Sequence, residues 1–179
     1  RPFGLARCEA SVKSQTVPDN IQHLLVVDQE QRGIEWTYEH MYLSVPSIKG
    51  DYVMLLDDDD YLVEPRLAEL LADKVANRPA VVMVKMDMGD GRVLPSLTWR
   101  AAPELGDVPC SSFIVRRDVF EQHSHDFGHD YGGDANFIKS VWNARHSFVW
   151  WDKVVSRVGQ VSRGAPETGG ANTWRLPPQ

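Results

Sequence analysis

Residues 49–60 read KGDYVMLLDDDD, an apolar run that ends in four consecutive aspartates. Every position from 52 to 56 is apolar or aromatic, which is typical of a strand buried on both faces. Two more apolar runs, residues 21–28 and 80–87, flank this one in the sequence, and each also ends in an aspartate. Segments with apolar residues at helical spacing separate the three runs. This alternation predicts an α/β fold in which helices flank a mostly parallel sheet.

The rest of the chain adds helices and a less regular second half. The pair Asp90-Gly91 is typical of a tight hairpin turn, which predicts a small antiparallel element there. Trp150 and Trp151 are adjacent in an expected strand and should therefore face opposite ways. The expected helices cover residues 4–15, 35–44, a segment beginning at Pro65, and 133–145, and the further expected strands cover residues 108–116 and 146–158.

Length and charge limit the classes of protein that the chain can represent. Its 179 residues suffice for one compact domain, and its formal net charge of −6 disfavours nucleic-acid binding, which needs a basic face. No apolar run reaches the ~20 residues of a membrane helix. Two cysteines, Cys8 and Cys110, are typical of reduced thiols and predict a cytoplasmic protein. We expect a single domain at residues 1–163 and a flexible tail or lid at residues 164–179.

The four aspartates at residues 57–60 are the first candidate for a functional site. Crowded carboxylates repel one another unless a cation lies among them, and oxygen ligands suit Mg²⁺ or Mn²⁺. The alternative is a solvated acidic cap on the following helix. Ligands of open α/β sheets bind beyond the carboxyl ends of the strands. The strand ends at Asp28, Asp57 and Asp87 therefore predict an acidic pocket rim.

Four segments of the chain resemble family 2 glycosyltransferases with the GT-A fold. Residues 50–60 resemble the family's G-(D/E)-Y-(I/V)-x-x-L-D-x-D-D segment. Residues 1–16 are similar to its R-P-x-x-L-x-x-C-x-x-S-V-x-x-Q-T helix, and residues 25–28 to its second strand. Gly133-Asp134 resembles the start of a helix in the second half of the family. The segments occur in the family's order over residues 1–160.

The resemblance implies a GT-A (Rossmann-like) fold and an enzyme. That enzyme would be a metal-dependent, inverting glycosyltransferase that takes a sugar from a nucleotide-diphosphate donor to an acceptor hydroxyl. One alternative is a non-catalytic nucleotide- or metal-binding module of the same fold. Another is a nucleotidyltransferase, which would want a glycine-rich phosphate loop with Lys or Arg near the start, and the sequence shows none.

The resemblance also implies roles for individual aspartates. A register one residue later in the acidic run would use Asp58 and Asp60 for the metal. For the aspartate at the helix start, a helix N-cap is the alternative. The implied roles are nucleotide-sugar binding for Asp28, Asp57 and Asp58, binding of Mn²⁺ or Mg²⁺ for Asp59 together with Asp57, and general base for Asp134.

Two further expectations concern the histidines and the start of the chain. His123, His125 and His129 would form a second metal cluster, supply an extra ligand to the donor metal, or line a polar acceptor loop. In the family, a strand precedes the helix at residues 4–15. We therefore expect the natural polypeptide to extend upstream by about 8–12 residues, including an apolar strand of ~5–6 residues that covers residues 21–27.

Overall fold

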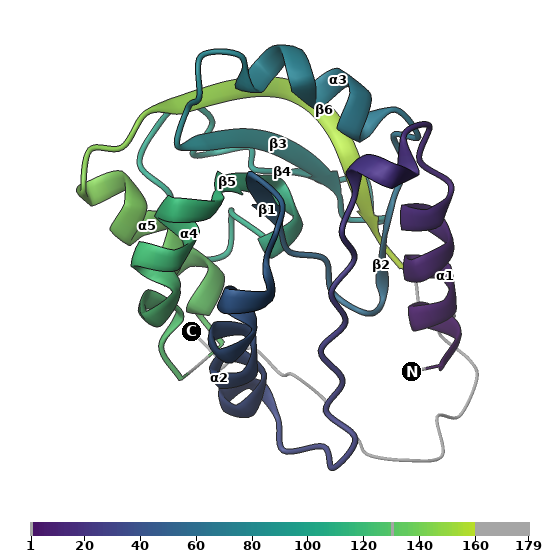
Figure 1. The fold of residues 1–179 in the computed structure, drawn as a ribbon. Helices are drawn as coiled ribbons and strands as arrows, with labels where there is room; N and C mark the ends of the chain where they lie inside the picture. Colours follow the sequence, from purple (N-terminus) through teal and green to yellow (C-terminus); the bar gives the residue numbers. More distant parts are fainter. Residues whose placement is uncertain (1, 130, 160–179) are drawn as a thin grey trace.

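The computed structural model describes residues 2–129 and 131–159 (Figure 1). The expected helices are present, each with ends within two residues of the expected ones. The α-helices are α1 Pro2–Lys13, α2 Ile34–Ser44, α3 Leu67–Val75, α4 Arg117–His123 and α5 Gly133–Asn143. The strands are β1 Tyr52–Met54, β2 Asp60–Leu62, β3 Val81–Asp87, β4 Val93–Leu94, β5 Phe113–Arg116 and β6 Phe148–Val158. Short 3₁₀ helices are η1 Pro18–Asn20, η2 Val45–Ser47, η3 Cys110–Ser112 and η4 Ser124–Phe127.

The described strands form one mixed sheet in the order β1-β5-β3-β6-β2, with β4 paired to β3. Among them, β3 and β6 run parallel, whereas the pairs β1–β5, β3–β5, β3–β4 and β2–β6 are antiparallel. The expectation of a mostly parallel sheet is therefore wrong. Burial of both faces makes a strand apolar throughout, but it does not set the direction of the neighbouring strands.

Helices cover both faces of the sheet and create two cores. In β3, Val81 and Met83 face one core, and Val82 and Val84 face the other. The larger core receives Phe137, Ile138 and Val141 from α5, and the smaller core receives Leu67, Leu71 and Val75 from α3. Figure 1 shows α3 on one side of the sheet and α4 and α5 on the other. Trp150 packs against the larger core and Trp151 against the smaller, which confirms that they face opposite ways.

Residues 21–28 do not form the strand expected there. Leu24 and Leu25 are 41% and 50% exposed, and no strand in the described part of the chain pairs with this segment. Near the start of residues 21–28, the Gln22 side-chain amide makes two hydrogen bonds. It donates to the carbonyl of Ser47 at 2.8 Å and accepts from the backbone N–H of Lys49 at 2.6 Å. An apolar run becomes a strand only where another strand offers backbone partners.

Two other expectations concern the ends and the surroundings of the chain. The expected tail at residues 164–179 lies outside the described residues.

No helix in the described ranges combines the length and the apolar character needed to cross a membrane. Cys8 and Cys110 are both free thiols and both buried. The cytoplasmic location stays a prediction.

Candidate active site

The four aspartates form the turn that leads into β2. The backbone N–H of Asp60 donates to the carbonyl of Asp57 at 3.0 Å. Arg7 of α1 holds this turn from outside, because its Nη2 donates to the carbonyl of Asp59 at 3.2 Å. The same guanidinium lies 4.4 Å from the ring centre of Tyr61. The helix that resembles the family's first helix therefore fixes the backbone of the acidic turn.

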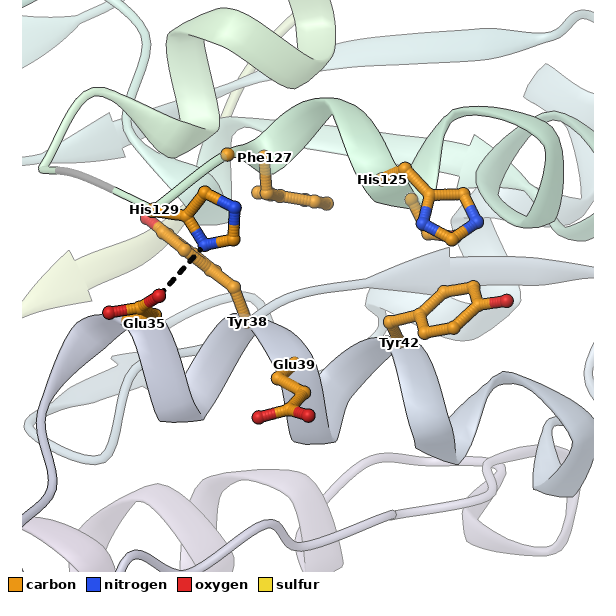
Figure 2. Close-up of a pocket in the computed structure, with 9 residues that line it drawn as sticks. Glu35, Tyr38, Glu39, Tyr42, His125, Phe127 and His129 are labelled. Atoms are coloured by element: carbon orange, nitrogen blue, oxygen red, sulfur yellow. Dashed lines mark ion pairs between the residues drawn. The ribbon is translucent and has the colours of Figure 1, made fainter.

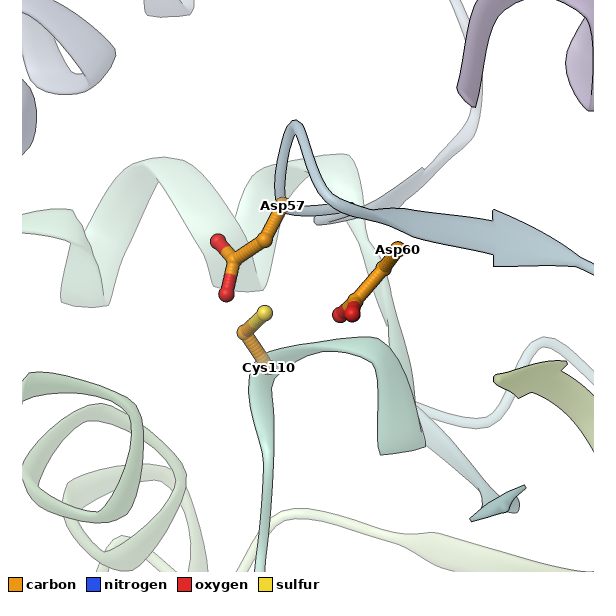
Figure 3. Close-up of side chains that lie close together, drawn as sticks. All are labelled: Asp57, Asp60 and Cys110. Carbon is orange, nitrogen blue, oxygen red and sulfur yellow. The ribbon is translucent and has the colours of Figure 1, made fainter. Parts of the chain in front are cut away.

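The turn sends its four side chains into different surroundings. Asp57 and Asp58 are exposed and Asp59 is half-buried, whereas Asp60 is only 4% exposed. One carboxylate oxygen each from Asp57 and Asp60 and the Sγ of Cys110 lie within 4.8 Å of one another (Figure 3). Within residues 2–129 and 131–159, this is the one set of three such side chains close enough to share a metal ion.

Asp60 is a carboxyl group whose charge is disfavoured in the absence of a cation. Burial, followed by the negative charges of Asp57 and Asp59, raises the pKa of Asp60 to about 8. Hydrogen bonds from the Ser111 hydroxyl, at 3.2 Å, and from the backbone N–H of Gly159 offset part of this effect.

A divalent cation would stabilise the ionised form of Asp60, and the carboxylates of Asp57 and Asp60 supply the oxygen ligands that such an ion prefers. Burial raises the pKa of the Cys110 thiol, so Cys110 lies beside these oxygens as a neutral thiol. The residues present therefore fit a divalent metal.

Asp134 lies beside this group, in the first turn of α5. Burial and the charge of Asp57 raise the pKa of Asp134 to about 7, and a hydrogen bond from the backbone N–H of Cys110 lowers it in part. The N-cap of α5 is Gly132, so Asp134 does not have the capping role that was its alternative. A carboxylate with a pKa near neutrality is suited to general acid–base chemistry.

Two glycines let other elements approach the site closely. A side chain at Gly133 would collide with the ring of Tyr38 on α2. A side chain at Gly159 would collide with the Arg7 guanidinium and the carbonyl of Asp59. Glycine at these positions therefore allows α2 to pack on the start of α5, and the end of β6 to pack on the acidic turn.

Asp28 and Asp87 do not join the acidic group. The backbone N–H of Gly33 donates to Oδ2 of Asp28 at 2.8 Å, and Arg32 lies 4.0 Å from Oδ1. Asp87 forms an ion pair with Arg157 at 3.5 Å. The expected strand end at Asp28 is wrong, because residues 21–28 are not a strand, whereas β3 does end at Asp87. The shared pocket rim stays a prediction.

Sequence reasoning missed two contributors to the site. Cys110 was interpreted only as a reduced thiol, and Ser111 was not considered. Both belong to η3, about 50 positions after the acidic turn, and only the folded sheet brings them together with it. Asp60 belongs to the later register of the acidic run, in which Asp58 and Asp60 would bind the metal. Of the two residues that this register contains, the structure places Asp60, and not Asp58, in the three-residue group.

The three clustered histidines lie in two different places. The ring of His125 lies 4.0 Å from that of Tyr42, and Nδ1 of His129 lies 3.3 Å from a carboxylate oxygen of Glu35 (Figure 2). Both histidines line a cavity of about 300 Å³ between α2 and η4. His123 is buried and faces the opposite side, toward α5. The three side chains therefore do not share one metal site.

The chain is similar to solved structures, although no protein-family model and no curated protein matches its sequence. The structures are those of TarS 1-349 from S. aureus. Its complex with UDP-GlcNAc superposes with a TM-score of 0.62 at 14% identity, over 86% of this chain and 54% of that one. Its complex with UDP gives a TM-score of 0.61 at 14% identity, over 86% and 56%. This chain thus spans about half the length of its TarS matches, and it has the fold of TarS, a GT-A glycosyltransferase.

Proposed function

We propose that this chain is the catalytic domain of a glycosyltransferase that moves a sugar from a nucleotide-diphosphate donor to an acceptor hydroxyl. The observation that carries the proposal is the set Asp57, Asp60 and Cys110 beside Asp134. The fold supports it, because TarS has been solved with UDP and with UDP-GlcNAc. UDP-GlcNAc is therefore the first donor to test.

The acidic group would bind the diphosphate end of the donor through a divalent ion, Mn²⁺ or Mg²⁺. Asp57 and Asp60 would hold this ion, and Asp59 stays a candidate ligand from the family resemblance. Such an ion supplies positive charge that stabilises the departing nucleoside diphosphate. Asp58 is exposed on the same turn and, with Asp57, would contact the nucleotide sugar.

Asp134 would be the general base. The acceptor hydroxyl loses a proton to its carboxylate while the hydroxyl oxygen bonds to the anomeric carbon and the diphosphate oxygen leaves with the electron pair. Direct displacement from the face opposite the leaving group inverts the anomeric configuration. Since the pKa of Asp134 is about 7, a large fraction of the carboxylate is ionised at neutral pH and ready to accept the proton.

Hydrolysis of UDP-GlcNAc tests the proposal without knowledge of the acceptor, because water replaces the acceptor hydroxyl. We expect hydrolysis with Mn²⁺ and none in EDTA. Asp134→Asn should lower turnover by ~100-fold or more while UDP affinity changes little. Asp73→Asn, an exposed carboxylate on α3, is the matched control and should leave turnover unchanged. Binding of UDP without any hydrolysis or transfer would instead identify a non-catalytic binding module.

A further inference from the structure

His123 and His146 meet away from the acidic group. His123 ends α4, and His146 lies in the turn between α5 and β6. Their Nε2 atoms are 3.3 Å apart, and the two rings are nearly perpendicular, at 86°. No step of the proposed transfer reaction uses this pair.

The surroundings of His123 fix which of its nitrogens carries the proton. Its Nδ1 lies 2.9 Å from a carboxylate oxygen of Asp126 and 2.9 Å from Oγ of Ser140. The Ser140 hydroxyl is itself 2.8 Å from the carbonyl of Phe137, to which it donates. The proton therefore lies on Nδ1 and is shared with these oxygens. In the tautomer with its proton on Nδ1, Nε2 has its lone pair on the side of His146.

The distance between the two Nε2 atoms matches a shared metal ion. The two Nε2 atoms are 3.3 Å apart, a separation at which one ring can donate a hydrogen bond to the other and which also matches a shared metal ion. Two nitrogens that each lie about 2.0–2.1 Å from a tetrahedral Zn²⁺ are about 3.3–3.4 Å apart. A carboxylate that accepts from the far nitrogen of a ligating histidine is the usual support of such a ligand, and Asp126 has that position.

The pair also has room for the remaining ligands. A cavity of about 220 Å³ lies beside His146 and is lined by Trp142 and Arg145. Water molecules in this space would complete the coordination. The positive charges of Arg145 beside the cavity and of Arg116 near His146 oppose a cation, and the carboxylate of Asp126 on the other side of His123 offsets part of this repulsion.

We propose that His123 and His146 bind one divalent transition-metal ion of the zinc class, with water as the other ligands. Imidazole nitrogens favour Zn²⁺, Co²⁺ and Ni²⁺ over Mg²⁺. The ion would link the end of α4 to the segment before β6, two parts of the chain that α5 separates in the sequence. The site is separate from the acidic group and does not depend on the proposed transferase function.

Zn²⁺ titration by calorimetry tests the proposal on the whole chain. His146→Gln should weaken one binding event by at least ~10-fold, and Asp126→Asn should weaken the same event by ~10-fold or more. His125→Gln is the matched control, because this histidine stacks on Tyr42, and it should leave the event unchanged. Asp60→Asn should also leave it unchanged, which separates the histidine pair from the acidic group.

Two results would overturn the proposal. One is a Zn²⁺ isotherm for His146→Gln that superimposes on that of the unsubstituted protein. The other comes from an NMR experiment on the unsubstituted protein. We expect Zn²⁺ to shift the Nε2 resonances of His123 and His146 and to leave the ring-nitrogen resonances of His125 unchanged. If Zn²⁺ moves neither resonance, the pair is joined by a hydrogen bond and holds no metal.

Discussion

Residues 21–28 and the strand β3 have similar sequences and opposite surroundings. IQHLLVVD at residues 21–28 and AVVMVKMD at residues 80–87 both place aliphatic residues before an aspartate. The first four residues of β3, 81–84, are 0% exposed, whereas residues 24–27 are between 36% and 50% exposed. β3 has strand partners on both edges and helices over both faces.

The difference shows that an apolar sequence favours burial, but that burial also requires neighbouring strands and helices to pack against the segment. β1 lies at one end of the strand order, and its second edge has no strand partner within the described residues. The hydrogen bonds of Gln22 tie the start of the exposed segment to residues 47 and 49, which precede β1 in the sequence.

The largest expected effect tests the comparison directly by stability. Met83→Ala removes a fully buried side chain from β3 and should lower the free energy of unfolding by about 3 kcal/mol. Leu25→Ala in the exposed segment should cost less than about 1 kcal/mol. Urea denaturation of both variants measures the difference. Equal losses would break the comparison and show that residues 24–27 are covered in solution.

The second expected effect is a dependence of the free energy of unfolding on pH, which the buried carboxyl of Asp60 causes. The pKa of Asp60 is raised in the folded protein from 3.8 to about 8, so its protonated form favours folding. In EDTA, this contribution is fully present below pH 4 and is lost as the pH rises through 8, by more than about 1 kcal/mol in total. Asp134, whose pKa is about 7, adds a similar loss below neutral pH. Denaturation at several pH values measures it.

The control for that experiment is the substitution of Asp60 itself. Asp60→Asn resembles the protonated carboxyl and should make the stability profile less steep between pH 7 and pH 8, a range over which Asp134 goes from about half ionised to largely ionised. An unchanged slope in Asp60→Asn would mean that the Asp60 carboxyl is ionised in the folded protein without a cation.

The smallest expected effect concerns the aspartate that ends the exposed segment. Oδ1 of Asp28 is buried without a hydrogen-bond partner among the described residues, so it can accept from an N–H of a bound nucleotide base. Asp28→Asn should weaken UDP binding by ~10-fold and change the free energy of unfolding by less than about 1 kcal/mol. Calorimetric titration with UDP checks this. Unchanged UDP affinity would remove Asp28 from the donor site.

Local patterns in the sequence predicted the helices and the hairpin well. Phe137, Ile138 and Val141 recur at helical spacing, and α5 buries all three. Asp90-Gly91 does join two antiparallel strands, β3 and β4. In both cases neighbouring residues contain the information, because the period of the apolar positions and the turn chemistry are local properties.

Strand pairing and the full site could not be predicted in the same way. The apolar run of β3 is compatible with parallel and antiparallel neighbours, and the structure gives it both. The acidic turn was found from its composition, but Cys110 reaches it only through the pairing of distant strands. Which aspartate is buried depends on the path of the turn, and four identical side chains in sequence carry no signal that distinguishes them.

Metal-linked donor binding tests the central claim most directly. UDP with Mn²⁺ should stabilise the protein by ~1–3 kcal/mol in a thermal unfolding experiment, and UDP in EDTA should not. Asp57→Asn replaces an exposed carboxylate of the acidic group, so the variant should fold and lose this stabilisation. Equal stabilisation by UDP in Mn²⁺ and in EDTA, or full stabilisation of Asp57→Asn, would contradict the assignment of Asp57 and Asp60 as the donor-metal site.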